Sequence, residues 1–216
     1  MVLEVGSKEQ ILYQLRNYGF ALIYNHWTKE KCEQGLQELK SIPSHLFEKS
    51  QGGDIRVQHS NKYCSTANDF LHDSFIQEIA DEYSECNVAQ RVLGGIVPFI
   101  PGQATDSGGG WHVDCERENQ LKAFMYLHDV NSDNGPFVFV QKSKELSKSL
   151  PKYDNLRISE ETIKNHVNPE DIIEMIAPAG TCILADSTFI HRGKQIQNGT
   201  RYTFTTYFYE AKDLNK

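Results

Sequence analysis

The first third of the chain combines amphipathic helical patterns with a short apolar run. Apolar residues at helical spacing predict three helices, over residues 8–17, 28–41 and 72–83. Ser7 and Gln10 form a capping-box signature in front of the first helix, and Gly19 ends it. The continuous apolar run over residues 20–24 predicts a strand between the first two helices.

From residue 88 onward the pattern changes to short apolar runs separated by Gly, Pro and Asn. Strands are predicted over residues 92–100, 121–130, 137–140, 171–176, 181–185 and 201–209. Many short strands with such turns predict a mostly β fold with flanking helices, built on a double-stranded β-helix (jelly-roll, cupin-like) core. A chain of 216 residues fits one domain, with a helical part over about residues 1–86 and the jelly-roll core over about residues 87–210.

Two polar stretches interrupt this pattern. Residues 49–69 are polar and poorly periodic, and we expect an ordinary surface loop to which no role is assigned, the alternative being a stretch that contributes substrate contacts. Residues 142–169 begin with four lysines and end in a short predicted helix over residues 159–166. The lysines are Lys142, Lys144, Lys148 and Lys152. We expect them to form a solvated face, and the alternative is a lid segment that meets an anionic substrate.

Charge and cysteine content narrow the partners and the compartment. The formal net charge is −7 and the basic residues are scattered, which argues against binding to nucleic acid or to an anionic membrane and favours a small-molecule substrate. Five cysteines without C-x-x-C spacing argue against a disulfide framework or a thiolate zinc site, and so indicate a reducing compartment. The N-terminus lacks signal-peptide features and no apolar run reaches membrane-spanning length, so we expect a cytoplasmic protein.

The segment Trp-His-Val-Asp at residues 111–114 carries the main chemical signal. On a strand, His112 and Asp114 project to one face while Val113 turns away into packing. His191 lies shortly after a predicted apolar strand and supplies a second imidazole. Two imidazoles and one carboxylate on one side of a metal are the ligand set of non-haem Fe(II) oxygenases, which leaves coordination positions open. One alternative is that these histidines have only a structural role and are hydrogen-bonded in the core. Another is that His166 replaces His191 as the third ligand.

A predicted strand that begins with an arginine follows His191. Arg201 begins the predicted strand over residues 201–209, so Arg201, Thr203 and Thr205 would share one face. A guanidinium binds a carboxylate through two parallel hydrogen bonds, and a hydroxyl can donate one more. The alternative is that Arg201 is a surface charge on an edge strand.

Lys122 is a further candidate. It would share a strand face with Phe124 and Tyr126, and a lysine turned toward a barrel interior is unfavourable unless it meets an anion. Lys122 could therefore contact a cosubstrate or substrate, and the alternative is a position at the rim of the barrel. Trp111 is expected to wall the site, and Asp186 to orient a ligand imidazole or to accept a hydrogen bond at its strand end.

These motifs together resemble a known family. The block of residues 108–144, which contains WHVD, LKAFMYLHDV and DNGPFVFV, and the spacing from His191 to Arg201 resemble the phytanoyl-CoA dioxygenase-like family of Fe(II)/2-oxoglutarate-dependent oxygenases. The resemblance covers the C-terminal two-thirds of the chain. One departure concerns the substrate-side loop, because such proteins commonly continue the DNGP strand with Pro-Gly-Ser-His where this chain has Gln-Lys-Ser-Lys at residues 141–144.

The resemblance implies a dioxygenase that hydroxylates an unactivated C–H bond of a small molecule. It implies His112, Asp114 and His191 as Fe(II) ligands and Arg201, with Thr203, as the anchor of the distal carboxylate of 2-oxoglutarate; Lys122 is a second candidate contact. Dioxygen would be consumed, succinate and CO2 released, and ascorbate is compatible with such chemistry. The substrate could be anionic.

Three other functions are weighed. A nucleic-acid demethylase of the same superfamily would resemble a pattern with an Arg six residues after Arg201, where this chain has Tyr207. The alternatives of a different class are a cupin-like metal-dependent isomerase and a non-catalytic jelly-roll binding protein. In both of these, Arg201 would need no dicarboxylate.

Overall fold

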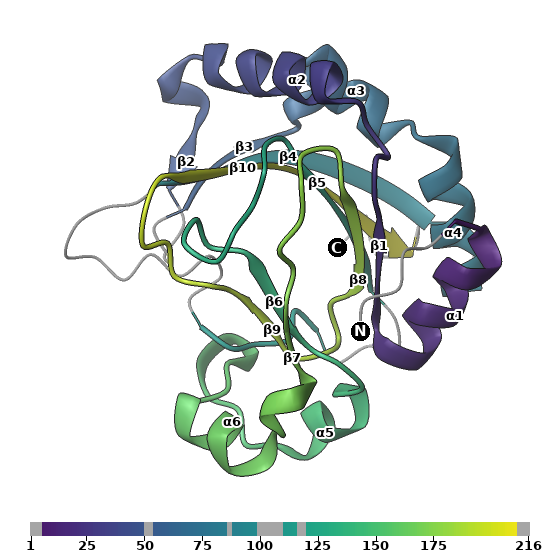
Figure 1. Ribbon diagram of the computed structural model, residues 1–216, viewed down its shortest axis with the longest axis vertical. Helices are drawn as coiled ribbons and strands as arrows, with labels where there is room; N and C mark the ends of the chain where they lie inside the picture. The colour runs from purple at the N-terminus through teal and green to yellow at the C-terminus, as the bar shows by residue number, and fades with distance from the viewer. Residues whose placement is uncertain (1–5, 50–53, 86–87, 99–109, 116–119, 211–216) are drawn as a thin grey trace.

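The computed structural model describes residues 6–49, 54–85, 88–98, 110–115 and 120–210, and these residues form two antiparallel sheets. The strands are β1 (Phe20–Ile23), β2 (Glu48–Lys49), β3 (Ile55–Gln58), β4 (Val88–Pro98), β5 (Leu121–Tyr126), β6 (Phe137–Val140), β7 (Ile172–Glu174), β8 (Cys182–Asp186), β9 (His191–Gly193) and β10 (Thr200–Glu210). The larger sheet has the order β1-β8-β5-β10-β4-β3-β2, and the smaller has the order β7-β6-β9. The two sheets face each other (Figure 1), which is the jelly-roll, cupin-like arrangement that the strand pattern predicts.

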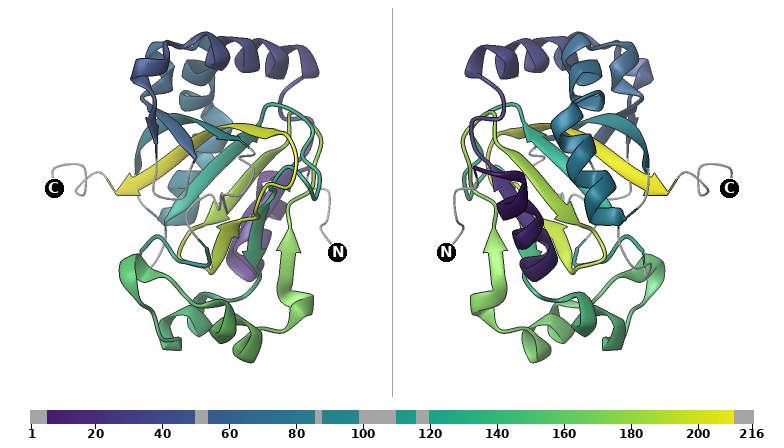
Figure 2. Two further views of the ribbon diagram at one scale, coloured as in Figure 1. Left: turned by 90° about the vertical axis from the view of Figure 1, so that its left-hand side faces the viewer. Right: turned by 90° about the vertical axis from the view of Figure 1, so that its right-hand side faces the viewer.

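Helices cover the outside of both sheets. They are α1 (Lys8–Tyr18), α2 (Lys29–Ser41), α3 (Ser65–Leu71), α4 (Ser74–Ser84), α5 (Lys144–Ser149) and α6 (Glu160–His166). Short 3-10 turns lie at Ser44–Leu46, Ser60–Lys62, Asp154–Leu156 and Pro169–Asp171. Figure 2 shows α2 at one end of the molecule, beyond the larger sheet, and α5 and α6 at the other end, beyond the smaller one. Of the helices described, none is long and apolar enough to cross a membrane.

The apolar side chains form three buried clusters that follow from strand alternation. One cluster packs α1 to α4 against the outer face of the larger sheet and includes Met125, Leu184 and Phe204. A second lies between the two sheets and includes Phe139 and Ile183. A third lies between the smaller sheet and the segment carrying α5 and α6. Because each strand of the larger sheet buries one face under helices, its other face is available to line an interior cavity.

The predicted elements are confirmed where their sequence signals are local. Ser7 and Gln10 form the capping box of α1, and Gly19 ends that helix in the left-handed conformation with φ 90. Thr28 caps α2. The third predicted helix begins later than expected, at Ser74, because the side chain of Asp73 caps it.

One prediction about local structure is wrong, and two elements were not predicted. The stretch over residues 49–69 is not a plain surface loop, because it contains β3, which pairs with β4, and the helix α3. The short helix α5 in the lysine-rich segment, where Lys142 and Lys148 are exposed as expected of a solvated face, and the strand β9 at His191 were not predicted. Each of these elements is short and takes its conformation from tertiary pairing, which outweighs weak local preferences.

The cysteines are consistent with the absence of a disulfide framework. Among the described residues Cys32, Cys64, Cys115 and Cys182 are free, and all but Cys115 are buried. Burial raises the pKa of the Cys32 thiol to about 11 and that of Cys64 to about 12. These thiols therefore remain protonated and behave as small apolar groups. Cys86 lies outside the described residues.

Candidate metal centre and its cavity

The predicted triad meets at one point because its segments pair directly. His112 and His191 exchange two backbone hydrogen bonds of 3.0 Å each, and the Asp114 N–H donates to the Ser187 carbonyl at 2.9 Å. His112 Nε2 lies 3.6 Å from Asp114 Oδ1, and His191 Nε2 lies 3.7 Å from Asp114 Oδ2. The three ligand atoms lie within 4.8 Å of one another, close enough to share one metal ion.

The segment that carries His112 differs from the predicted regular strand. His112 forms only isolated bridges, to His191 and to Arg157. The alternation of side chains nevertheless holds locally, because Val113 is buried in the cluster near α5 and α6 while His112 and Asp114 line the cavity. The prediction of a shared face is therefore right, although its basis is pairing with β9 rather than an extended strand.

The protonation states suit a metal ion. His112 Nδ1 donates to the Gly110 carbonyl and His191 Nδ1 to the Phe189 carbonyl, both at 2.8 Å, so each Nε2 is the unprotonated nitrogen. Burial lowers the pKa of His112, and burial with the neighbouring His112 lowers the pKa of His191 to about 3. Burial alone would raise the pKa of Asp114, but the Lys122 ammonium together with the neighbouring His191 and His112 holds that pKa well below the ordinary value. Two neutral imidazoles and a carboxylate are the forms that bind a divalent metal.

The triad opens into a cavity of about 320 Å³. The alternation predicted for two strands is confirmed here, because the cavity-facing side chains of the larger sheet come from one face of β10 and one face of β5. From β10 they are Arg201, Thr203, Thr205, Tyr207 and Tyr209, and from β5 they are Lys122, Phe124 and Tyr126. The Arg201 side chain is buried, at 6% exposure, rather than a surface charge on an edge strand. A volume above about 300 Å³ is typical of small-molecule sites.

Arg201 and Lys122 occupy different parts of this cavity. Lys122 pairs in register with Tyr207, six residues along β10 from Arg201, which is about 20 Å of strand. The Lys122 ammonium contacts the Asp114 carboxylate and lies 4.6 Å from the centre of the Tyr207 ring. Lys122 is thus turned into the interior, with 6% exposure, and forms an ion pair with Asp114.

Arg56 and Asp54 also line the cavity, and no role was predicted for either. Arg56 lies opposite Gly95 on β4, and Gly95 lies opposite Thr203 on β10, so no side chain of β4 stands between them in this row. Arg56 Nε donates to the buried Asp54 carboxylate at 2.5 Å. The sequence carried a signal, since Ile-Arg-Val-Gln at residues 55–58 alternates apolar and polar residues, but four residues are too few to stand out.

Three other predicted residues lie away from the cavity. Trp111 is buried in the cluster near α5 and α6, and the Arg192 guanidinium lies 4.1 Å over its ring, so Trp111 does not wall the site. His166, the rival third ligand, is exposed and bonds the Thr162 carbonyl. Asp186 accepts hydrogen bonds from Thr188, Gln120 and Tyr83 at the end of β8, which is the strand-end acceptor role given as the alternative to orienting a ligand imidazole.

The lysine-rich segment does not line the cavity that the structure describes. Lys142 lies 5.1 Å over the Tyr18 ring, and Lys144 forms an ion pair of 3.4 Å with Asp186. Lys148 pairs with Glu145 on the same helix. These contacts favour a docked helix over a mobile lid.

Comparisons with known proteins agree with this geometry. The family model described as Phytanoyl-CoA dioxygenase (PhyH) matches residues 15–201. The epimerase SnoN, solved with Fe3+, alpha ketoglutarate and nogalamycin RO, is 15% identical, with 94% of this chain and 84% of that chain covered and a TM-score of 0.75. HygX from Streptomyces hygroscopicus, solved with nickel and 2-oxoglutarate, is 14% identical, with 95% and 88% covered and a TM-score of 0.70. At these identities the structures show a shared fold. No curated protein sequence matches the chain.

The buried imidazoles predict that the metal-free protein loses stability in mild acid. His191 has a folded pKa of about 3 against 6.5 for an exposed imidazole, so below pH 6.5 the unfolded chain binds a proton that the folded chain does not. Lowering the pH from 7 to 5 should therefore reduce the free energy of unfolding by about 2 kcal/mol through His191 alone. Urea unfolding of chelator-treated protein should show this slope, and His191→Asn should remove that part of it. An identical slope in the variant would contradict a buried, neutral His191.

Proposed function

Because the chain belongs to the phytanoyl-CoA dioxygenase family, we propose that it is a non-haem Fe(II)- and 2-oxoglutarate-dependent dioxygenase that hydroxylates an unactivated C–H bond of a small molecule. The observation that carries the proposal is the presence of the His-Asp-His triad and the buried Arg201 in the walls of one cavity. A metal-dependent isomerase or a binding protein has no need of a buried guanidinium placed to receive a second carboxylate.

In this proposal His112, Asp114 and His191 hold the iron. Their donor set fits, since two unprotonated Nε2 atoms and a carboxylate converge within 4.8 Å. The three residues cover one side of the ion and leave the other positions open. When bound there, Fe(II) couples the oxidative decarboxylation of 2-oxoglutarate by O2, which gives succinate and CO2, to oxidation of the substrate. Asp114 fills the position that a halide would need, which disfavours halogenation.

Arg201 would hold the distal carboxylate of 2-oxoglutarate, with Thr203 beside it on the same face of β10. A guanidinium binds a carboxylate through two parallel charge-assisted hydrogen bonds, and a dicarboxylate chelated to the metal at one end would present its other carboxylate for such a pair. Arg56 lies in the neighbouring row across Gly95 and adds a second cation on this side of the cavity.

Lys122 would act on Asp114 rather than on the distal carboxylate. Its ammonium contacts the carboxylate while Tyr207 lies under the lysine. Binding one carboxylate oxygen leaves the other to face the metal, so Lys122 helps orient Asp114 as a ligand through a single oxygen. The same ammonium lines the cavity and would attract an anionic group of the substrate.

The substrate end of the cavity is polar and aromatic. Tyr207 and Tyr209 stack with ring centres 6.1 Å apart and an angle of 8° between planes. Arg56, Lys122 and Arg201 give the described cavity wall three cations against the two carboxylates of Asp54 and Asp114. This lining suits a small polar molecule, including an anionic one. Similar structures hold nogalamycin RO and hygromycin B, which supports a small-molecule substrate here.

A second outcome for the same site is epimerisation or ring closure. It is favoured by the similarity to SnoN, an epimerase, and to SnoK, a carbocyclase 12% identical to this chain. Both outcomes use the triad and the cosubstrate, and they differ in the product. Hydroxylation adds one oxygen atom from O2, whereas epimerisation adds none, so mass spectrometry of a product formed under labelled O2 separates them.

Removing any member of the triad should abolish stoichiometric Fe(II) binding, because each variant removes one of three protein ligands. The variants are His112→Ala, Asp114→Ala and His191→Ala, and anaerobic equilibrium dialysis measures the bound iron. The matched control is His166→Ala, which removes an exposed imidazole and should bind iron normally. Normal iron binding by His191→Ala together with loss of binding in His166→Ala would show that His166, and not His191, is the third ligand.

Arg201 should set the affinity for 2-oxoglutarate without changing that for iron. Arg201→Lys keeps the charge but loses the planar fork, so the cosubstrate should bind more weakly. Arg201→Ala removes one partner of a desolvated ion pair, typically about 2–5 kcal/mol, which corresponds to well over tenfold in Kd. The control is Arg192→Lys, since Arg192 lies over Trp111 outside the cavity wall. Calorimetric titration of each iron-loaded variant with 2-oxoglutarate measures the Kd of the cosubstrate. An unchanged Kd in Arg201→Ala would rule out Arg201 as its anchor.

A further inference from the structure

A buried carboxylate lies next to the triad without touching it. Asp186, at the end of β8, is 0% exposed. Its Oδ1 accepts from the Thr188 hydroxyl at 2.7 Å, the Thr188 N–H at 3.0 Å and the Gln120 N–H at 3.3 Å. Its Oδ2 accepts from the Tyr83 hydroxyl at 2.7 Å and from the Lys144 ammonium at 3.4 Å. The carboxylate thus joins the turn after β8 to helices α4 and α5.

The turn that this carboxylate folds carries contacts to two members of the triad. The Ser187 carbonyl accepts from the Asp114 N–H at 2.9 Å, and the Phe189 carbonyl accepts from His191 Nδ1 at 2.8 Å. The Phe189 N–H in turn donates to the Asp186 carbonyl at 3.2 Å. A change in the turn would therefore move the backbone of Asp114 and the ring of His191 together.

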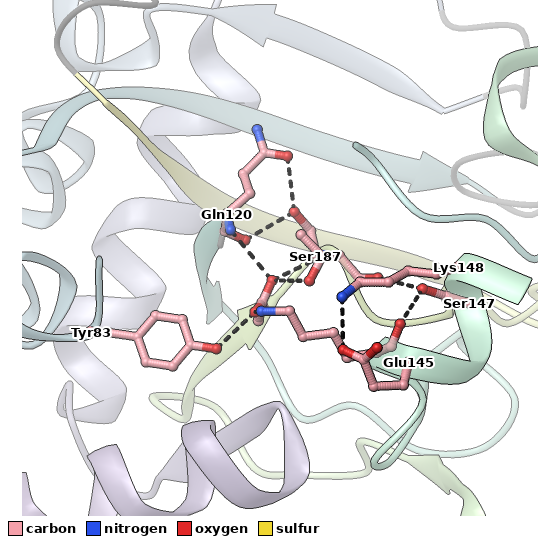
Figure 3. A network of polar contacts seen from close by, with 9 residues as sticks. Tyr83, Gln120, Glu145, Ser147, Lys148 and Ser187 are labelled. Atoms are coloured by element: carbon pink, nitrogen blue, oxygen red, sulfur yellow. Dashed lines mark hydrogen bonds and ion pairs between the residues drawn. The ribbon is translucent and has the colours of Figure 1, made fainter. Parts of the chain in front are cut away.

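Helix α5 is fastened to the same turn at three points. Besides the ion pair of Lys144, the Ser147 hydroxyl is shared between the Lys144 carbonyl at 2.8 Å and the Thr188 carbonyl at 3.2 Å. The Ile190 N–H, directly after the turn, donates to Ser143 Oγ at 2.9 Å. Figure 3 shows Tyr83 reaching the network from one side and α5, with Ser147, from the other, while Ser187 and Gln120 lie between them. Lys144, at the start of α5, thus stabilises the turn through Asp186.

We propose that Asp186, held by Tyr83 and Lys144, is a positioning residue that sets the placement of Asp114 and His191 for the metal through the turn at residues 186–189. The proposal rests on the function proposed above, since it concerns the same metal. Residues that orient metal ligands from behind commonly change metal affinity ten- to a hundredfold when they are replaced. Asp186 would act through backbone carbonyls, which no sequence motif reveals.

The central test is Asp186→Asn. The amide keeps the size of the side chain but presents an NH2 group or a neutral oxygen to the Lys144 ammonium, so the turn should relax. We expect anaerobic Fe(II) binding to weaken ten- to a hundredfold and the visible spectrum of the Co(II)-loaded protein to shift, because that spectrum reports ligand geometry. Lys144→Met should produce a smaller change in the same direction, and Lys144→Arg should stay near the wild type because it keeps the charge.

The matched control is Glu38→Gln. Glu38 ties α2 to α3 with a comparable set of bonds, from the Ser65 hydroxyl at 2.6 Å and from the hydroxyl and N–H of Thr66 at 2.7 and 3.0 Å. None of these residues lies in the triad or in the turn. Glu38→Gln should lower the melting temperature and leave the Fe(II) affinity and the Co(II) spectrum unchanged.

The outcomes separate a positioning role from a structural one. A lower melting temperature in Asp186→Asn with Fe(II) affinity within twofold of the wild type and an unchanged Co(II) spectrum would overturn the proposal. If Asp186→Asn does not fold, Tyr83→Phe and Lys144→Met replace it as tests, because each removes one partner of Asp186 Oδ2. Wild-type Fe(II) affinity and Co(II) spectra in both variants would also overturn the proposal. Failure of the wild type to bind Fe(II) would instead overturn the proposed function, and this inference with it.

Discussion

The site depends on the two-way backbone pairing of His112 with His191. These residues lie far apart in the sequence, yet each N–H donates to the other's carbonyl at 3.0 Å, and the rings come to rest with centres 4.3 Å apart. The carbonyls of Gly110 and Phe189 then fix each ring with Nε2 toward Asp114. One local pairing therefore sets the position, tautomer and direction of two of the three groups proposed to hold the metal.

The remainder of the site is an electrostatic arrangement around that pairing. The larger sheet turns Lys122 and Arg201 inward, where a charge without a partner is strongly disfavoured. Lys122 meets Asp114, whose pKa it lowers, and Arg201 lies further along the cavity wall, where we propose that it binds the distal carboxylate of the cosubstrate. In the proposed complex the charges of the metal, the cosubstrate and these side chains therefore depend on one another.

Sequence patterns predicted those parts of the site that follow from strand alternation. Arg201, Thr203 and Lys122 face the cavity because a period of two fixes which side chains share a face, and His112 and Asp114 share theirs for a similar reason. The patterns could not predict Arg56, since β3 is only four residues long and exists through its pairing with β4. They also misplaced Trp111 and Lys144, because both are positioned by contacts to residues distant in the sequence, Arg192 and Asp186.

The most direct test of the account is an anaerobic visible titration of the wild-type protein with Fe(II) and 2-oxoglutarate. The account predicts a charge-transfer band that requires both additions, because only an iron held by the triad with open positions can be chelated by the cosubstrate in this cavity. Succinate does not chelate in this way and should give no band. Tight iron binding without any band on addition of 2-oxoglutarate would contradict the account and favour a metal-binding jelly roll of another class.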